Sequence, residues 1–445
     1  MASASTERRR VVAATTIGTA IEWYDFFLYA AVAGLVFNQL MFGPLGPGAA
    51  TVVSFLTVGL SFLFRPLGAF LAGHYADKLG RRVVLMVTLF AMGGATTLIG
   101  LVPSFEAIGV WAPLLLILLR IVQGISAGGE WGSAVLLAVE HAPRTKRGLY
   151  GAGPQVGAPA GLLMANGALA LMNWLAPGDA FMVWGWRVPF LFSIVLVLIG
   201  FLIRIGVDES PVYTEMAQDH RARHVPANPI GTLFTCHFSL VVAGALLFAA
   251  NGVAGYMMAG GYIQSYTTGP LGLERGPILL IVTASAAVWI VSTVLAGAWS
   301  DRIGRKNMFL LGFVVQALGV VVLFPMVNSG DYLRIFAALA FLSVGLGLTY
   351  GQTSATYAEL FPASVRGSGV SITYAIGSIL GGAFAPMIAA WLVEATGSTA
   401  GVTAYLLAAS VVGFVTAALL RDRTGIPLGH DEEERQAQGH FVFAR

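Results

Sequence analysis

Long runs of apolar residues dominate this chain. An α-helix needs about 20 apolar residues to cross the hydrocarbon core of a bilayer, and runs of this length recur along most of the 445 residues. Only 11% of the residues are charged, whereas a soluble domain carries about 25%. The sequence therefore predicts an all-α membrane protein with twelve spans, near 13–37, 49–75, 83–103, 110–141, 149–173, 185–205, 230–258, 277–300, 307–327, 333–359, 367–393 and 400–421.

The longest polar stretch separates these spans into two sets of six. It runs from Asp208 to Asn228 and has the composition of a linker. We therefore expect an N-terminal six-helix bundle (1–205), a cytoplasmic linker (206–229), a C-terminal six-helix bundle (230–424) and a short cytoplasmic tail (425–445), in which the DEEER run is a solvated charge cluster.

Basic residues in the loops predict the orientation of the chain. Two of the 25 Lys and Arg residues, Arg65 and Arg120, lie inside spans. If the N-terminus is cytoplasmic, only Arg187, Arg275 and Arg334 fall on the outer side. Because cytoplasmic loops carry an excess of Lys and Arg, both termini are predicted to be cytoplasmic.

Two sequence patterns recur at matching places in the two halves. Residues 73–82 (GHYADKLGRR) and 297–306 (GAWSDRIGRK) share the pattern G-x-x-x-D-[KR]-[LI]-G-R-[KR] after the second span of each half. The pattern E-x-x-P-x-x-x-R-G begins at Glu140 and again at Glu359, after each fourth span. Parallel repeats of this kind place a substrate site between the halves, near the bilayer midplane.

The loop pattern resembles the signature of the major facilitator superfamily over essentially the whole chain. Four segments resemble the metabolite–proton symporter family in particular, and its shikimate permease group most of all: EWYDFFLY (22–29), FLFRPLGAFLAGHYADKLGRR (62–82), RIVQGISAGGEWGSA (120–134) and WGWRVPFLFSIVLVLIGFLIR (184–204). This resemblance implies the major facilitator fold, a bacterial inner-membrane location, and uptake of a small organic acid or zwitterion coupled to proton entry.

Charged residues in the middle of the spans are confined to the N-terminal half, namely Glu22, Asp25, Arg65, Arg120 and Glu130. Charge within a bilayer is costly, so such residues are functional candidates by default. With a rise of about 1.5 Å per residue, Asp25 and Arg120 fall in an upper layer and Arg65 and Glu130 in a lower one. Glu22 lies one turn below Asp25 and could serve either layer.

We expect Asp25 to lie opposite Arg120 as a switchable proton site, because an adjacent arginine keeps a buried carboxylate ionised. Protonation of Asp25 would then release Arg120, and either this guanidinium or that of Arg65 would bind a substrate carboxylate. Glu22 and Glu130 are further candidates for proton coupling. The alternative is a static ion pair that only fixes helix packing.

The repeated patterns also predict a charge latch on the inner face. Asp77, Arg81, Asp301 and Arg305 lie where helices end, and the resemblance implies that such residues hold the inner face closed during alternating access. Solubility and topology would account for the basic residues but not for the two aspartates. We expect the second pattern to join this latch through Glu140, Arg147, Glu359 and Arg366.

Neutral polar residues within apolar spans are weaker candidates for substrate contacts. Gln155 lies among glycines and prolines of the fifth span, in GAGPQVGAPAG (151–161). The second half supplies Asn251, Tyr256, Tyr350, Gln352 and Tyr374. Each of these could orient a substrate, or could instead form a hydrogen bond between helices.

Several function classes have no support in the sequence. No nucleotide-binding, hydrolase or zinc pattern is present, and Cys236 is the single cysteine, so we expect no enzyme, no metal, no cofactor besides the proton and no nucleic-acid partner. We expect a monomer in the lipid bilayer that imports a small carboxylate-bearing metabolite. The alternatives are a proton-coupled exporter of drugs or metabolites, an uncoupled facilitator, or a receptor derived from a transporter.

Overall fold

The computed structural model describes residues 4–79, 81–128, 130–205, 229–429 and 432–442. Most of these residues are helical, and the β pairing among them is an isolated bridge between Leu420 and Phe441. The predicted linker, 206–229, lies almost entirely outside the described residues.

The first half contains six long helical segments and several short connecting turns. Its first segment combines α1 (Ala4–Val32), the π-helix η1 (Ala33–Phe37) and α2 (Asn38–Leu40). The others are α3 (Pro47–Leu79), α4 (Arg81–Ile99), α6 (Trp111–Ala127) with α7 (Glu130–Glu140), α8 (Arg147–Leu175), and α9 (Arg187–Ile205), with the short α5 (Phe105–Ile108) between α4 and α6.

The second half repeats this pattern with more interruptions. Its helices are α11 (Pro229–Cys236), α12 (Phe238–Ala259) and α13 (Tyr262–Thr268), then α14 (Arg275–Ile303), α15 (Arg305–Val327), α16 (Tyr332–Tyr350) with α17 (Thr353–Leu360), α18 (Arg366–Ser378) with the π-helix η5 (Ile379–Ala383) and α19 (Ala385–Thr396), and α20 (Ala400–Leu419). A short helix, α21 (Glu433–Ala437), follows in the tail.

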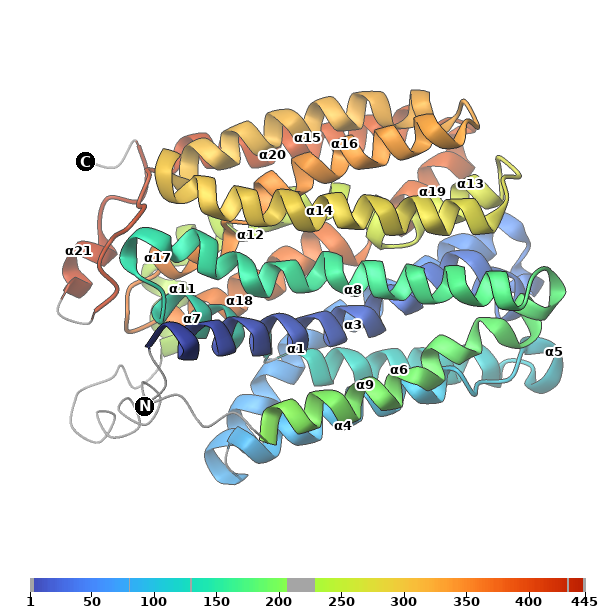
Figure 1. The fold of residues 1–445 in the computed structure, drawn as a ribbon, viewed down its shortest axis with the longest axis horizontal. Helices are drawn as coiled ribbons and strands as arrows, with labels where there is room; N and C mark the ends of the chain where they lie inside the picture. The colour runs from blue at the N-terminus through green and yellow to red at the C-terminus, as the bar shows by residue number, and fades with distance from the viewer. Residues whose placement is uncertain (1–3, 80, 129, 206–228, 430–431, 443–445) are drawn as a thin grey trace.

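Ten helical segments among the described residues are long and apolar enough to cross a membrane. Two shorter apolar helices, Met86–Ile99 and Trp111–Ala127, correspond to the third and fourth predicted spans. The helices lie side by side, with α4, α6 and α9 at one side of the bundle and α15, α16 and α20 at the other (Figure 1). The beginning of α1 and the tail helix α21 lie at the same end (Figure 1).

The two halves meet mainly along two sets of helices. Helix α8 packs along α14, and α3 packs against η5 and α19. Glycine permits this close approach, because a Cβ atom on Gly148 of α8 would lie 2.3 Å from the carbonyl oxygen of Gly297 in α14. Within the first half, Gly157 and Gly161 of α8 lie equally close to α1. Small residues at helix interfaces are the usual route to tight packing in a bilayer.

The end of the molecule opposite the tail is also closed. A Cβ atom on Gly34 of η1 would lie 2.8 Å from the carbonyl oxygen of Gly261, between α12 and α13. Gly261 itself has φ +81 and would place a Cβ 2.2 Å from the carbonyl oxygen of Ala30. The two halves therefore touch at this end, and the residues at the centre of the bundle are enclosed.

Candidate functional site

Arg120 of α6 is fully buried, and neutral groups satisfy its guanidinium. Its Nη2 donates to the Ser61 hydroxyl (2.7 Å) and to the carbonyl of Val58 (2.8 Å), and its Nε donates to the carbonyl of Thr57 (3.3 Å). The guanidinium also lies 4.1 Å from the ring centroid of Tyr29. These contacts tie α6 to the facing helix α3 and to α1.

A chain of hydrogen bonds leads from Arg120 toward Asp25. Arg120 Nη1 donates to Gln123 Oε1 (2.8 Å), and Gln123 Nε2 donates to the Thr96 hydroxyl of α4 (2.7 Å). The Thr96 hydroxyl donates to the carbonyl of Met92 in its own helix (3.0 Å) and lies beside Asp25, whose Oδ1 accepts a hydrogen bond of 2.7 Å from Ser193 of α9. Asp25 is therefore enclosed by α1, α4 and α9, inside the N-terminal bundle.

This arrangement corrects the predicted direct pairing of Asp25 with Arg120. Among the described side chains, Asp25 has no arginine within ion-pair distance, and its bonded partners are hydroxyl groups. The depth estimate placed both residues in one layer but could not show that Gln123 and Thr96 stand between them. Neither residue lines the small cavity that Trp23, Tyr256 and Trp289 help to enclose between the halves.

Arg65 of α3 has weaker contacts than Arg120, although it is also buried. Its Nη2 lies 3.7 Å from Glu22 Oε1, and its Nη1 donates to the Tyr374 hydroxyl at 3.5 Å. Its Nε has no hydrogen-bond partner among the described residues. Glu22, rather than the predicted Glu130, is thus the described acid beside Arg65, and the side chain of Glu130 lies outside the described residues.

Aromatic rings surround Arg65 and continue into the second half. The guanidinium carbon of Arg65 lies 4.6 Å from the ring centroid of Phe62 and 5.4 Å from that of Trp23. Trp131 of α7 stacks on Tyr374 of α18, with centroids 3.7 Å apart and an interplanar angle of 11°. Arg65 therefore faces the boundary between the halves, where Tyr374 reaches it from the other side.

A cavity of about 20 Å³ lies beside this aromatic layer, with room for about one water molecule. Three of the predicted substrate residues, Asn251, Tyr256 and Tyr350, line it. The remaining lining residues are small or aromatic, namely Trp23, Phe27, Ala158, Phe248, Gly252, Gly255 and Trp289.

The other neutral candidates form hydrogen bonds within or between helices. Gln155 of α8 donates to the carbonyl of Tyr350 (3.2 Å) and so crosses between the halves. Gln352 donates to the carbonyl of Leu348 in its own helix segment (2.9 Å). Asn251 also donates to the Thr349 hydroxyl (2.7 Å) in addition to facing the cavity.

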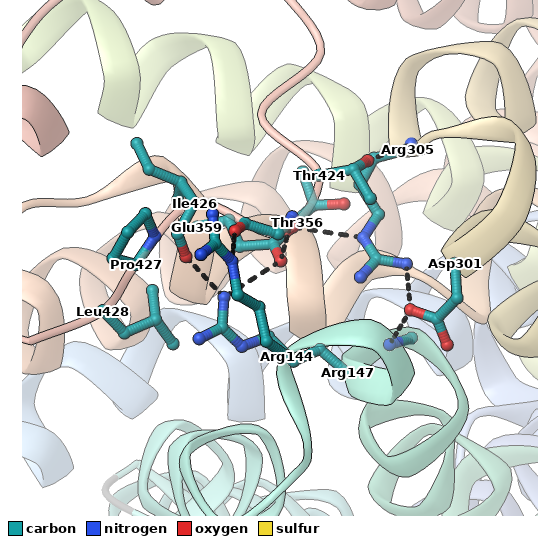
Figure 2. A network of polar contacts seen from close by, with 12 residues as sticks. Arg144, Arg147, Asp301, Arg305, Thr356, Glu359, Thr424, Ile426, Pro427 and Leu428 are labelled. Atoms are coloured by element: carbon teal, nitrogen blue, oxygen red, sulfur yellow. Dashed lines mark hydrogen bonds and ion pairs between the residues drawn. The ribbon is translucent and has the colours of Figure 1, made fainter.

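At the end of the molecule near the tail, Asp301 of α14 binds the beginning of α8 in the other half (Figure 2). Its carboxylate accepts from the backbone N–H groups of Gly148 (2.8 Å) and Leu149 (2.9 Å). The first N–H groups of a helix lack partners within the helix, and the helix dipole favours an anion there. Asp301 also pairs with Arg305 at 2.9 Å.

Glu359 of α17 joins the two halves at the same end. Its Oε2 pairs with Arg305 Nε (3.1 Å), and its Oε1 lies 3.5 Å from Arg147 Nη1 of the first half (Figure 2). Arg366 and Glu140 form a second pair between the halves at 3.7 Å. We call these six residues the latch: Glu140, Arg147, Asp301, Arg305, Glu359 and Arg366. The side chains of Asp77 and Arg81, the remaining predicted members, lie outside the described residues.

The tail folds over the latch. Its carbonyl groups accept hydrogen bonds from latch arginines, from Arg147 at Ile426 (2.5 Å) and from Arg366 at Leu428 (3.0 Å). The side chain of Gln436 accepts from Arg366 Nη2 (3.0 Å) and from the backbone N–H of Ala363 (2.8 Å). The tail is therefore bound to the latch, while Glu432 and Arg435 of its DEEER run stay at the surface, with side chains 43% and 67% exposed.

Packing in the tail region lowers the pKa values of two ionisable groups, His440 and Arg423. Burial, with a smaller contribution from Arg423, lowers the pKa of His440 to about 4. The imidazole, whose Nε2 lies 3.0 Å from the carbonyl oxygen of Leu360, is thus neutral at pH 7. Burial lowers the pKa of Arg423 to about 10, and its Nη2 donates to the carbonyl of Gln436 (2.7 Å).

Three functional candidates were missed because their side chains are neutral. Gln123 and Thr96 lie between Arg120 and Asp25, and Ser193 donates to Asp25. Polar residues of these types also occur as ordinary contacts between helices. Gln123 alone left a signal, since it lies three residues after Arg120 and thus on the same helix face.

Comparisons with known proteins agree with this architecture. The Major Facilitator Superfamily model matches residues 15–386 and 240–443. The inner membrane metabolite transport protein YhjE of Escherichia coli (strain K12) is 42% identical, covering 86% of this chain and 88% of its own. The shikimate transporter of the same organism is 36% identical (93% and 94%), which confirms the predicted resemblance. The glycine betaine/proline/ectoine/pipecolic acid transporter OusA of Dickeya dadantii (strain 3937) is 34% identical (94% and 84%).

Solved structures confirm the predicted fold. The proton:xylose symporter XylE superposes with a TM-score of 0.77 at 17% sequence identity, covering 98% of this chain and 100% of that one. At this identity the likeness shows the fold alone. With the family model and the relatives taken together, the chain belongs to the Major Facilitator Superfamily of membrane transporters and is not an enzyme.

Proposed function

We propose that this protein couples proton entry to the uptake of a small carboxylate-bearing metabolite across a bacterial inner membrane. The observation that carries the proposal is a pair of buried ionisable side chains: Asp25, which could hold a proton, and Arg65, which could bind an anion. The latch end would face the cytoplasm, as the distribution of basic loop residues predicts, and the chain would act as a monomer.

Asp25 has the surroundings of a proton site. Its described partners, Ser193 and Thr96, are neutral, and an ionised carboxylate in an apolar interior is costly unless a cation compensates it. Hydrogen bonds connect Thr96, beside Asp25, through Gln123 to the guanidinium of Arg120. Loss of the proton from Asp25 would therefore draw on Arg120, whose hydrogen bonds hold α3 and α6 together.

Arg65 has the properties of a carboxylate anchor. An arginine stays charged and can bind a carboxylate with two parallel hydrogen bonds. The bonds of Arg65 are long, at 3.5 and 3.7 Å, and its Nε has no described partner. A substrate carboxylate could thus replace weak contacts, whereas at Arg120 it would have to displace bonds as short as 2.7 Å.

The names of the relatives support the substrate class. Shikimate, glycine betaine, proline, ectoine and pipecolic acid, the compounds in those names, all carry a carboxylate. They share little else, since some are anions and others zwitterions. The chemistry common to all of them is the group that Arg65 could bind.

Transport by Asp25→Asn in proteoliposomes tests proton coupling. With an acidic exterior, we expect the wild-type protein to concentrate substrate and to bring in protons, reported by a pH dye inside the vesicles. Asn cannot exchange a proton, so the variant should equilibrate substrate without accumulating it. Glu106→Gln, at an exposed position of the short α5, is the matched control and should accumulate normally.

The alternatives predict different results. An exporter that exchanges protons for substrate would be stimulated by the inverted gradient, and an uncoupled facilitator would give no pH change in wild-type vesicles. Undiminished proton uptake in Asp25→Asn would remove this residue from the mechanism.

A further inference from the structure

Two buried amides join the halves near the end of the molecule opposite the latch. Gln264 belongs to α13, which lies toward that end, and Asn166 belongs to α8 of the first half (Figure 1). Gln264 Nε2 donates to Asn166 Oδ1 at 3.2 Å, and both side chains are fully buried. We call these two residues the amide pair. Their bond crosses the boundary along which the halves must separate when this end opens.

Neighbouring hydrogen bonds fix the direction in which both amides point. Gln264 Nε2 also donates to the carbonyl of Met258 (3.1 Å), and Asn166 Nδ2 donates to the carbonyl of Leu162 in its own helix (3.2 Å). Each amide nitrogen thus faces a carbonyl oxygen, which leaves Asn166 Oδ1 as the acceptor for Gln264. Because Met258 belongs to α12, Gln264 connects α12 and α13 with α8 of the other half.

The amide pair differs in chemistry from the latch, where ion pairs join the halves. At the end opposite the latch, the described charged side chains that reach the other half have no ion pair. Arg275 donates to the sulfur of Met182 (3.4 Å) and lies 4.6 Å from the ring centroid of Phe181. The carboxylate of Glu394 in α19 packs against Gly48 of α3. The amide pair is therefore a neutral counterpart of the ionic latch.

One atom of the amide pair is left unsatisfied when the halves are closed. Gln264 Oε1 is buried without a hydrogen-bond partner among the described residues. Gln316, which is equally buried but bonds within one half, uses both ends of its amide, at the carbonyl of Ala250 (3.0 Å) and the hydroxyl of Thr349 (3.5 Å). A buried acceptor without a partner costs free energy, which is recovered when water reaches it. Closure by the amide pair therefore carries a cost that opening removes.

We propose that Gln264 and Asn166 hold the end opposite the latch closed, and that this end opens when water replaces the bond between them. In the orientation proposed above, this end faces the more acidic side of the membrane. Amide side chains have no group that titrates in the physiological range, so external acid does not change the charge of this closure. The proposal concerns closure of the halves and does not depend on which substrate Arg65 binds.

Thiol labelling of purified protein tests the amide pair. Ser265→Cys in a Cys236→Ser background is the reporter, because Ser265 is buried and its Cβ would lie 2.9 Å from a Cβ added to Gly34 of the other half. Asn166→Ala removes the acceptor from the side of the boundary that does not carry the reporter. We expect it to speed maleimide labelling about three- to tenfold. Labelling of Ser354→Cys, the matching reporter at the latch end, should not become faster.

Gln316→Leu is the control, because it removes an equally buried amide that bonds within one half. It should leave labelling of both reporters at the parent rates. The double variant Asn166→Ala with Gln264→Leu completes a mutant cycle. Since the two residues act through one bond, the double variant should label no faster than the faster of the two single variants.

Three results would overturn the proposal. Labelling of Ser265→Cys at the parent rate in Asn166→Ala would show that the bond does not hold this end. Faster labelling of both reporters would show a general loosening of the protein. Effects of Asn166→Ala and Gln264→Leu that multiply in the double variant would show that the two residues act separately.

Discussion

Arg65 and Arg120 lie in the same bundle with different bonding. Four hydrogen bonds of 2.7–3.3 Å to neutral acceptors hold Arg120, two of them to backbone carbonyls of α3. Arg65 has one long ion pair and one long hydrogen bond. Because both side chains are buried, the difference lies in the hydrogen bonds that each guanidinium would lose on binding a ligand, and this makes Arg65 the better anchor for an anion.

Gln123→Leu should disconnect the proton site from Arg120. Leucine preserves most of the volume but removes the acceptor of Arg120 Nη1 and one hydrogen bond of the Thr96 hydroxyl, which still donates to the carbonyl of Met92. This loss should cost about 1–3 kcal/mol in the free energy of unfolding. Because Asp25 would then titrate without help from Arg120, we expect the pH of half-maximal uptake to shift. A pH profile of uptake in proteoliposomes measures this shift.

The matched control is Gln316→Leu in the second half. Gln316 is equally buried and bonds to the carbonyl of Ala250 and the hydroxyl of Ser410, both at 3.0 Å. Its loss should lower thermal stability to a similar degree without moving the pH profile. A profile that Gln123→Leu also leaves in place would show that the hydrogen-bond chain does not carry coupling.

The sequence identified which charges are buried but not which groups they contact. Counting residues along a helix gives depth, and it placed Asp25 and Arg120 correctly within the N-terminal half. Contacts between helices depend on how each helix is rotated about its axis and on which helices are neighbours. Neither follows from the spacing of single residues, so Glu22 beside Arg65 and Gln123 beside Arg120 had to come from the structure.

At the scale of elements, the latch is a helix terminus held by a charge from the other half. The carboxylate of Asp301 accepts hydrogen bonds from the first free N–H groups of α8. Glu359 forms an ion pair with Arg147, the residue that begins α8. Opening this end must break both contacts. The tail opposes opening, because it bonds to Arg147 and Arg366 while they hold their latch partners.

Gln436→Ala should weaken closure at the latch end. Alanine removes the acceptor that Gln436 offers to Arg366 and to the N–H of Ala363, so the tail should detach more often. Ser354→Cys in a Cys236→Ser background provides a reporter, because Ser354 is fully buried between the halves, beside Gly151. We expect several-fold faster maleimide labelling of this cysteine, and a correspondingly less stable closed end.

Glu432→Ala is the control for this variant. Glu432 forms an exposed pair with Arg435 at 3.7 Å, and pairs of this kind contribute about 0–1 kcal/mol. Labelling should therefore stay at the parent rate. Equal labelling rates in Gln436→Ala and Glu432→Ala would mean that the tail rests on the latch without stabilising it.

Element positions were largely predictable, whereas interruptions and the tail were not. Hydropathy located the helical segments. The repeated patterns identified the latch residues of the second half, which are Asp301, Arg305, Glu359 and Arg366. The π-helices η1 and η5 interrupt spans for which the sequence predicted regular helix. The polar composition of the tail could not reveal that Gln436 and His440 would be buried.

At the scale of the whole molecule, contacts at both ends enclose the centre. The latch and tail close one end, and the approach of Gly34 to Gly261 closes the other. The halves must separate at one end at a time for a substrate to enter and leave without a leak. Each contact must therefore be weak enough to break during transport. A substitution at either contact should change how much of the time that end of the molecule is open.

Gly34→Val should bias the molecule toward opening at the end opposite the latch. Even the Cβ of this side chain would lie 2.8 Å from the Gly261 carbonyl oxygen and 2.9 Å from Ser265 Cβ, so the halves cannot close there. Since the two ends alternate, the latch end should stay shut more of the time. We expect uptake to fall at least tenfold, and the buried Ser354→Cys reporter to label more slowly than in its parent.

Gly94→Ala separates this effect from the general cost of replacing a glycine. A Cβ at Gly94 meets no atom within 4 Å, and alanine favours a helix by about 1 kcal/mol over glycine, so uptake and labelling should match the parent. Faster labelling of Ser354→Cys in Gly34→Val would mean that the two ends open together. In that case the protein would not work by alternating access about a central site, because a contact broken at one end would have loosened the other.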